Sequence, residues 1–425
     1  MKLDYKKTFL IGFGFLASSL AWSLYNSFVP LILRDYVGSS LLIGMVMTID
    51  NIFGVVFQPL FGQLSDRTHT RFGKRMPYIM IGIPLCAIAF SLIPFMQTLV
   101  ATMAAIIAFN FIMSTWRSPV IALMPDLTPS PLRSKANGII NMMGGIGAII
   151  AFMVGGRLTT WGGFKASFIM GSIVMVLALV VLMLFVREPD TRLNRPLQDK
   201  STSEDDSETL TAARTSAKHL TKDEKRSLFA LLFAIFFWFC GFNAVETFFT
   251  SYATTNLGLE AGAAAGMLTY FSLALVAFAI PAGILATRFG RRRMILIGLA
   301  GIIAAFTPML FVSSKTLVQI LMIVAGSFWA LVNINSLPMV VELAASDRIG
   351  SFTGYYYFFS FSAAIVSPSL FGLIHDLTKD YDNLFVYSAV AFLLAFVCML
   401  QVRHGEARTA PALSEEIPLE VKKGG

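Results

Sequence analysis

Long apolar stretches alternate with short polar segments along the whole chain, and this alternation is its dominant pattern. A helix needs about 20 mostly apolar residues to cross the hydrocarbon of a bilayer. Twelve stretches meet that length, six in each half of the chain. They comprise residues 8–33, 40–65, 77–96, 99–125, 135–158, 164–186, 226–253, 260–287, 293–312, 316–343, 352–374 and 383–402. The pattern therefore predicts an all-α membrane protein with twelve transmembrane helices.

The composition agrees with this prediction. Of the 425 residues, 56% are hydrophobic and 14% are charged, which is far from the composition of a soluble domain. Most of the chain is needed to cross the bilayer, so no large soluble domain fits. The cysteines Cys86, Cys240 and Cys398 fall inside predicted helices, where we expect them to pack as small side chains without forming disulfides.

The basic residues lie mainly on one side of the predicted membrane. Of the 33 Lys and Arg residues, those in loops on the other side are only Arg34, Arg157, Lys165, Lys315 and Lys379. Cytoplasmic loops of membrane proteins carry an excess of Lys and Arg. We therefore expect both termini in the cytoplasm, with the protein in a plasma membrane or bacterial inner membrane. The net charge of +8 then reflects topology and does not indicate nucleic-acid binding.

The chain divides into two similar halves. The fourth and tenth predicted helices share a Trp, a Pro and an acidic residue, which are Trp116, Pro125 and Asp126 in one and Trp329, Pro338 and Glu342 in the other. We expect six-helix bundles over residues 1–186 and 226–403. Residues 187–225 between them have too little apolar surface to fold alone and are predicted to form a solvated cytoplasmic linker, while 404–425 form a disordered tail. Repeats of this kind place a substrate site between the two bundles.

A signature of glycines and charges follows the second predicted helix. Its residues are Gly62, Leu64, Asp66, Arg67, Arg71, Gly73, Lys74 and Arg75, and a looser copy runs from Gly283 to Arg293. The signature resembles that of the major facilitator superfamily, in which two homologous six-helix bundles rock about a central site. The resemblance implies a conformational gate formed by Gly62, Asp66, Arg67, Arg71, Gly73 and Arg75.

The form of the signature also indicates a branch of that superfamily. The first copy is longer than the second, with Gln-Pro-Leu before it at 58–60 and Pro-Tyr-Ile after it at 77–79. This form resembles plant sucrose/proton symporters and the wider glycoside-pentoside-hexuronide:cation symporter family. Arg117, Ala122 and Asp126 are similar to the Arg-Ala-Leu-x-x-Asp-Leu stretch of the sucrose group. The resemblance implies a secondary active transporter that carries a glycoside or disaccharide together with a cation.

The second predicted helix departs from one part of that pattern. Melibiose-type carriers place two acidic residues one helical turn apart as sodium ligands, whereas Asp50 is followed four residues later by Gly54. A sodium cage needs several oxygen ligands. We therefore expect coupling to protons rather than to sodium, and we expect neither a resident metal nor a cofactor.

Three ionisable residues, Asp50, Arg117 and Glu246, fall inside predicted helices. A charge at mid-bilayer costs about 2.5–3.5 kcal/mol on insertion scales, so each needs an explanation. A carboxylate that alternates between a water-shielded setting and one beside an arginine can take up and release a proton. We expect Asp50 and Glu246 to serve in proton coupling with Arg117 as a permanent countercharge. The alternative is a static ion pair inside the bundle.

A sugar site needs aromatic faces for the apolar side of the ring and amides for its hydroxyl groups. The predicted helices offer Trp22, Tyr25, Asn26, Asn110, Trp116, Asn141, Trp238, Asn243, Trp329 and Asn333. Taken singly, such residues are also typical of interfacial anchors and of hydrogen bonds between helices. Asn243 with Glu246, and Tyr25 with Asn26, stand out because each pair groups polar atoms on one helix.

Two other functions are compatible with this architecture. A proton-coupled exporter of a drug or metabolite would share the fold, but drug antiporters of the superfamily usually carry a Gly-Pro pair in the fifth helix, and residues 135–158 contain no proline. A non-transporting membrane sensor would need a folded soluble domain, which neither the linker nor the tail resembles. No phosphate-binding loop or nucleophile constellation indicates an enzyme. The favoured hypothesis is a monomer that transports a sugar with protons.

Overall fold

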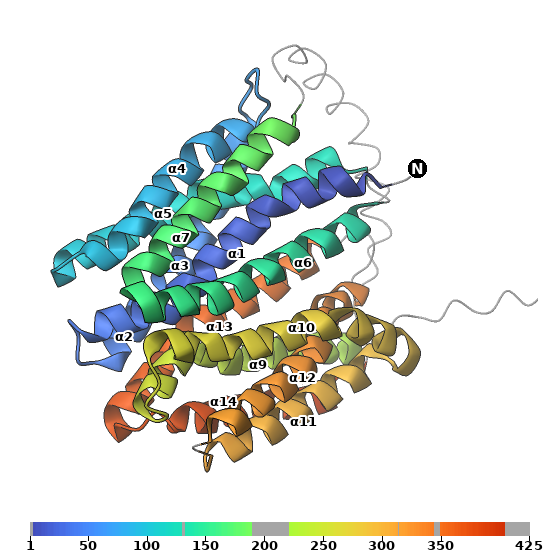
Figure 1. Ribbon diagram of the computed structural model, residues 1–425. Helices are drawn as coiled ribbons and strands as arrows, with labels where there is room; N and C mark the ends of the chain where they lie inside the picture. The colour runs from blue at the N-terminus through green and yellow to red at the C-terminus, as the bar shows by residue number, and fades with distance from the viewer. Residues whose placement is uncertain (1–2, 130–131, 189–220, 313, 344–348, 404–425) are drawn as a thin grey trace, which may run out of the picture.

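The computed structural model describes residues 3–129, 132–188, 221–312, 314–343 and 349–403, and every regular element within these ranges is a helix. Figure 1 shows two sets of helices lying against each other. The first set contains α1 (Tyr5–Arg34), α2 (Ser40–Met47), α3 (Ile49–Asp66), α4 (Met76–Leu92), α5 (Leu99–Leu127), α6 (Arg133–Ile150) and α7 (Gly156–Phe185). The second contains α9 (Lys222–Thr255), α10 (Ala261–Phe289), α11 (Arg291–Met309), α12 (Lys315–Glu342), α13 (Ile349–Thr378) and α14 (Asn383–Gln401).

Eleven segments of the described residues are long and apolar enough to cross a bilayer. One of them, Ala136–Phe185, has 50 residues. At 1.5 Å per residue it is roughly 75 Å long, more than twice the hydrocarbon thickness of about 30 Å. Gly163 divides it, because its φ of 68° is a left-handed conformation that glycine adopts without a steric penalty. The chain therefore crosses the membrane twice here, which confirms the prediction of twelve spans and of a multi-pass membrane protein.

Several helices differ in detail from the predicted spans. The second span is interrupted at Thr48, so that α3 begins next to Asp50. A π-turn at Ala151–Gly155 joins α6 to α7. The helix α9 begins at Lys222, four residues before the predicted start, because Thr221 and Glu224 form a reciprocal capping box. The rest of the predicted linker, from 189 to 220, and the predicted tail, 404–425, lie outside the described residues.

The two bundles are joined by hydrogen bonds at the end of the molecule that carries Arg34. There Asp376 of α13 accepts from Ser39 Oγ at 2.5 Å and from the amides of Ser40 and Leu41 at 2.8 and 3.0 Å. The carboxylate thus satisfies free N–H groups at the first turn of α2, which belongs to the other bundle. Nearby, Arg34 Nη1 donates to Thr255 Oγ1 at 3.0 Å. Figure 1 shows the bundles closest here and further apart toward the N-terminal end of α1.

Close approach between helices depends on glycine. A Cβ on Gly147 of α6 would lie 2.3 Å from the carbonyl oxygen of Leu16 in α1, and a Cβ on Gly44 of α2 would lie 2.3 Å from that of Pro368 in α13. Backbone oxygen atoms cannot move aside as a flexible side chain can. These positions therefore fix how near the helix axes come, as small residues do in membrane bundles.

Substituting Gly147→Leu is expected to lower stability by about 1–3 kcal/mol, because the added side chain forces α6 away from α1. Gly138→Leu is the matched control on the same helix, since a Cβ at Gly138 would meet no atom within 4 Å. Thermal denaturation of both purified variants in detergent measures the difference. Equal midpoints for the two variants would contradict the role assigned to the α1–α6 contact.

Candidate functional site

Asp50 lies just beyond the break between α2 and α3, inside the span Ser40–Asp66. The backbone amide and the Nδ2 of Asn51 both donate to Asp50 Oδ1, at 2.6 and 2.7 Å. The carboxylate is half-buried and lies within the electric fields of Arg117 and Glu246. The irregular start of α3 therefore holds an acid inside the membrane opposite charged groups from two other helices.

Arg117 reaches the same region from α5. Its guanidinium carbon lies 5.4 Å from the centre of the Trp22 ring on α1, within cation–π range. The Trp22 ring in turn meets Tyr25 edge-on, with 5.7 Å between the ring centres. Thus α1 supplies aromatic surface and α5 supplies a permanent positive charge beside it.

Glu246 brings the second bundle into this region. Its carboxylate interacts with the Asn26 side chain of α1 and acts electrostatically on Asp50. One turn further along α9, Thr250 Oγ1 donates to the backbone carbonyl of Ser27 at 2.7 Å. The structure therefore brings together the three ionisable residues singled out in the sequence, at the surface where the bundles meet. Asn26, Asp50, Arg117 and Glu246 together form what we term the central polar cluster.

Two buried polar atoms lie beside the central polar cluster without a hydrogen-bond partner among the described residues. They are Trp22 Nε1, a donor, and Asn110 Oδ1, an acceptor. The other end of the Asn110 amide donates to the Tyr25 hydroxyl at 3.1 Å, which fixes the orientation of both side chains. A buried unpaired polar atom costs free energy unless a water or a ligand satisfies it. These two atoms are suited to bind the hydroxyl groups of a small molecule.

The other candidates of the first bundle lie apart from this cluster. Asn141 is exposed on α6, one turn before Gly145, where a Cβ would meet Val276 of α10. It therefore belongs to the face of α6 turned toward the second bundle. Trp116 is fully buried and packs against Gly82 of α4, inside the first bundle.

In the second bundle, the aromatic candidates form part of the packed interior. Trp329 of α12 is buried and stacks face to face on Phe242 of α9, with ring centres 4.6 Å apart. Trp238 is also buried. Asn243 is half-buried and donates to the backbone of its own helix, and Asn333 is half-buried one turn after Trp329. Sequence reasoning missed Phe242, because nothing in the pattern separates it from the other 37 phenylalanines.

Arg75, where α4 begins, is the centre of a charge network on the side with most of the basic residues. Its guanidinium pairs with Asp66 at the end of α3 and, at 2.9 Å, with Asp126 of α5. Its Nη1 also donates to the carbonyl of Gly62 at 3.1 Å. Lys74 Nζ lies 3.2 Å from Asp126. The arginine is almost fully buried, which is tolerable only because its donors are paired in this way.

Glu188, just after α7, completes the network. Its Oε2 accepts from the backbone amides of Arg75 and Met76, at 2.8 and 3.2 Å. Gly73 allows this approach, since its φ of 95° is unfavourable for other residues and a Cβ there would overlap the Glu188 carboxylate. Sequence reasoning missed Glu188, because a lone acidic residue after a helix carries no pattern. The contact forms between segments more than 100 residues apart.

The predicted gate residues thus fall into two groups. Gly62, Asp66, Gly73 and Arg75 take part in the network described above. The Arg71 guanidinium instead lies 4.6 Å from the ring centre of Phe72, on the exposed loop. Arg67 is the C-cap of α3, and its carbonyl contacts the ring of His69 at 2.8 Å.

The second bundle contains a reduced copy of this network. Gly290, with a φ of 91°, precedes Arg291, just as Gly73 precedes Lys74 and Arg75. Arg291 Nη1 lies 3.2 Å from Glu342 Oε2 at the end of α12 and donates to the carbonyl of Pro338. The pairing repeats that of Arg75 with Asp126, as expected for two homologous halves.

Twelve membrane crossings in two repeated bundles, with a polar cluster between them and a charge network at the loops, define a transporter of small molecules. The chain belongs to the Major Facilitator Superfamily, whose family model matches residues 11–268 and 253–423. It is a membrane transporter and not an enzyme.

Individual relatives are more distant. The chain is 27% identical over 48% of its length to the general alpha-glucoside permease of Schizosaccharomyces pombe, and 26% identical over 36% to a sucrose transport protein of Arabidopsis thaliana. These matches span 40% and 33% of those relatives. The tetracycline resistance protein, class H, of Pasteurella multocida is 23% identical over 91% of this chain and 93% of its own. A bacterial homologue of the human lysosomal transporter Spinster shares the fold, with a TM-score of 0.68, 12% identity and 95% coverage of both chains.

Substituting Asp66→Ala is expected to slow transport about two- to fivefold while leaving substrate affinity nearly unchanged. The substitution removes one exposed partner of Arg75, a loss of about 0.5–1 kcal/mol, far from the central polar cluster. Initial rates in proteoliposomes and equilibrium binding in detergent measure the two quantities separately. Arg71→Ala, in the same loop but outside the network, is the control and should retain the wild-type rate. An Asp66→Ala rate equal to that of Arg71→Ala would exclude a role of this pair in the transport cycle.

Proposed function

We propose that this transporter imports a sugar, a glycoside or disaccharide, together with protons. The observation that carries the proposal is the electrostatic interaction of Asp50 with Arg117 and with Glu246 of the other bundle, where the two bundles touch. Two carboxylates and one arginine leave one acid without a full countercharge. Acids in that situation favour holding a proton when shielded from water and release it when water or the arginine comes nearer.

The aromatic and amide groups beside the cluster support a sugar as the substrate. Trp22 and Tyr25 offer ring faces to the apolar side of a pyranose, and Asn26 and Asn110 offer amide groups to its hydroxyls. The unpartnered Trp22 Nε1 and Asn110 Oδ1 add one donor and one acceptor. Similarity to an alpha-glucoside permease and a sucrose transport protein supports the same substrate class.

The excess of basic residues in one set of loops supports an orientation with both ends of the chain in the cytoplasm. The hydrogen bonds made by Asp376 and Arg34 then close the molecule on the outer side. In this arrangement the central polar cluster would be reached from the cytoplasm. Import requires these outer contacts to break in each cycle.

A second candidate is a proton-coupled exporter of a drug. It is favoured by the match to the tetracycline resistance protein, class H, which covers nearly the whole chain rather than part of it. Against it, the segment 135–158 lacks the proline expected of drug antiporters. Proteoliposomes challenged with labelled mono- and disaccharides and with tetracycline, each with and without an imposed pH gradient, distinguish the two. Sugar accumulation driven by the pH gradient would support the import of sugar. Movement of tetracycline without any sugar uptake would instead support the export of a drug.

Asp50→Asn is expected to abolish sugar accumulation driven by a pH gradient and to preserve exchange of sugar for sugar. Asparagine keeps nearly the same volume and a polar head but cannot carry a proton, and exchange requires no net proton movement. Both activities are measured in the same proteoliposomes. Asp382→Asn, at the outer loop, is the control and should accumulate sugar as the wild type does. If Asp50→Asn still accumulates sugar against its gradient, Asp50 is not the coupling site and Glu246→Gln becomes the variant to examine.

A further inference from the structure

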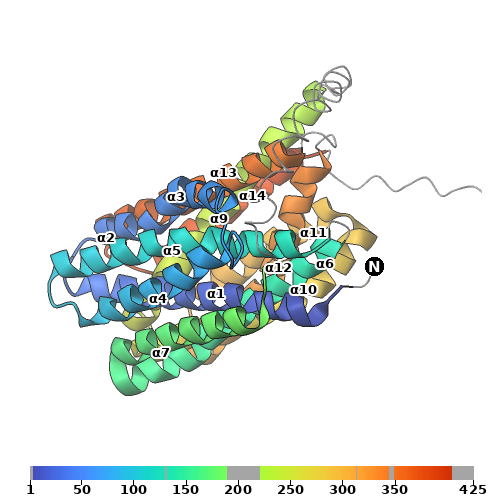
Figure 2. The ribbon, with the colours of Figure 1, turned by 90° about the horizontal axis from the view of Figure 1, so that it is seen from above.

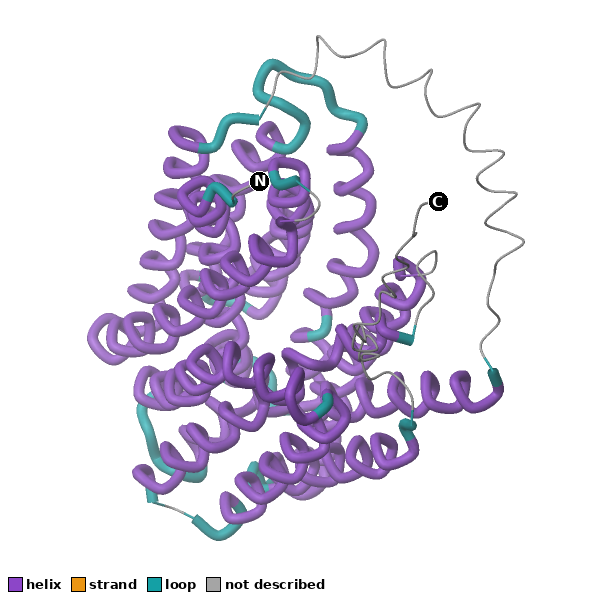
Figure 3. Tube along the Cα trace, turned by 90° about the vertical axis from the view of Figure 1, so that its right-hand side faces the viewer, coloured by secondary structure: helices purple, strands orange, loops and turns teal. Residues whose placement is uncertain are grey.

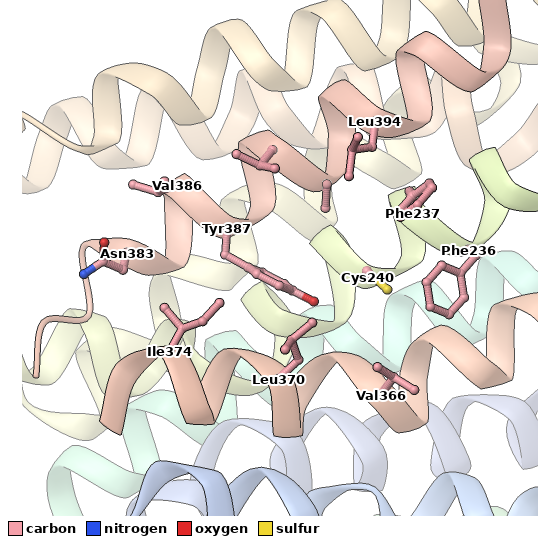
Figure 4. Close-up of a pocket in the computed structure, with 12 residues that line it drawn as sticks. Phe236, Phe237, Cys240, Val366, Leu370, Ile374, Asn383, Val386, Tyr387 and Leu394 are labelled. Carbon is pink, nitrogen blue, oxygen red and sulfur yellow. The ribbon is translucent and has the colours of Figure 1, made fainter. Parts of the chain in front are cut away.

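An apolar groove lies on the membrane-facing side of the second bundle, between α13 and α14 with α9 at its base (Figure 4). Its volume is about 320 Å³. It is lined by Phe236, Phe237, Cys240, Val366, Leu370, Ile374, Asn383, Val386, Tyr387, Val390, Ala391 and Leu394. In Figure 4 the Tyr387 ring extends across the groove toward Cys240. Its hydroxyl donates to Ser367 Oγ at 3.1 Å, so the tyrosine presents mainly ring surface.

The walls of this groove are open to the bilayer. Val366, Leu370, Val390 and Leu394 are each 43–51% exposed although they lie inside membrane spans. The helix α14 packs chiefly against α9 and α11 and only lightly against α13, which leaves the groove between α13 and α14. An elongated apolar recess with lipid-exposed walls has the shape and chemistry of an acyl-chain site.

A second cavity, of about 440 Å³, continues from the first toward the side with most of the basic residues. Phe237 lines both cavities. Phe229, Phe233 and Phe237 follow one another at intervals of one helical turn along α9, and Phe229 and Phe233 are 59% and 47% exposed. Gln401 and Arg226 form the polar end of this cavity. The two cavities together make one path from mid-membrane to a basic end.

Further cations lie close to that end. The backbone amide of Arg403 donates to Ser227 Oγ at 3.2 Å, which places Arg403 beside the residue that follows Arg226. Arg292 of α11 donates to the carbonyl of Leu400 at 2.9 Å, near the last turn of α14. The carboxylate of Glu224, in the first turn of α9, accepts a hydrogen bond from the backbone amide of Thr221 in the helix cap.

The basic end lies at the depth of lipid head groups. With 34 residues, α9 is roughly 51 Å long and exceeds the hydrocarbon core of about 30 Å. Figures 2 and 3 show its first turns extending beyond the neighbouring helices. Basic pockets between membrane helices attract anionic head groups in this way.

We propose that this groove binds one anionic phospholipid from the leaflet on the basic side. The phosphate lies against Arg226, within the field of Arg403 and Arg292, and one acyl chain follows the phenylalanine stripe of α9 into the groove between α13 and α14. A free phosphate ion would use only the basic end and would leave the apolar groove unfilled. A neutral phospholipid would fill the groove with less attraction at Arg226.

Native mass spectrometry of the full-length protein in neutral detergent tests this site with phosphatidylglycerol and phosphatidylcholine. The wild type is expected to retain one phosphatidylglycerol at concentrations where phosphatidylcholine is lost. Arg226→Gln should weaken phosphatidylglycerol binding about fivefold. Arg187→Gln removes an exposed arginine from the first bundle, on the same side of the membrane, and should leave binding unchanged. Equal retention of the two lipids, or equal loss in the two variants, would overturn the proposal.

A second pair of variants tests the acyl-chain path independently of charge. Val390→Trp places a bulky ring in the groove from a lipid-exposed position and should reduce binding of phosphatidylglycerol. Val397→Trp, on the same helix, is similarly exposed but does not line either cavity, so it should bind as the wild type does. Identical binding of phosphatidylglycerol by these two variants would show that its acyl chain does not lie in this groove. Displacement of the lipid by millimolar inorganic phosphate would show instead a site for a soluble anion.

Discussion

The constraint on which this structure depends is that hydrocarbon offers no water to polar groups. Every crossing is therefore a helix that satisfies its own backbone, and polar side chains inside the membrane must find partners in the protein. Asp50 receives two hydrogen bonds from Asn51, Arg117 lies over Trp22, and Glu246 interacts with the Asn26 side chain. The same requirement concentrates the intramembrane charges at one place, the surface where the two bundles meet. The proposed transport site and the stability of the protein in the membrane thus follow from one physical cause.

The two ends of the molecule are held by different contacts. On the basic side, Arg75 ties α3, α4 and α5 together within one bundle, and Arg291 does the same on a smaller scale in the other. At the opposite end, Asp376 and Arg34 link one bundle to the other. Networks inside a bundle keep it rigid, whereas a few polar bonds between bundles can break and re-form. This division suits a protein whose halves rock as bodies about a central site.

The groove on the second bundle is a feature of the surface that faces the bilayer. The helix α13 contacts α2 of the first bundle on one side and borders the lipid-exposed groove on the other. A lipid chain in that groove would lie against one of the helices that closes the molecule. The helix α9, at the base of the groove, also carries Glu246, so the proposed lipid site and the proposed substrate site share this helix.

The sequence by itself determined the membrane class, the twelve spans and the repeat of two halves, because helix length and apolar composition are local properties. It also identified Asp50, Arg117 and Glu246, since a charge inside an apolar stretch is visible without any structure. Only the tertiary structure decided which residues meet. It placed Trp22 with Arg117 but Trp116 and Trp329 inside their bundles, and it revealed Glu188 and Asp376 as partners of distant segments. The contacts of Arg117, Glu188 and Asp376 join residues more than 90 positions apart, and no periodicity along the chain encodes which helix faces turn toward one another.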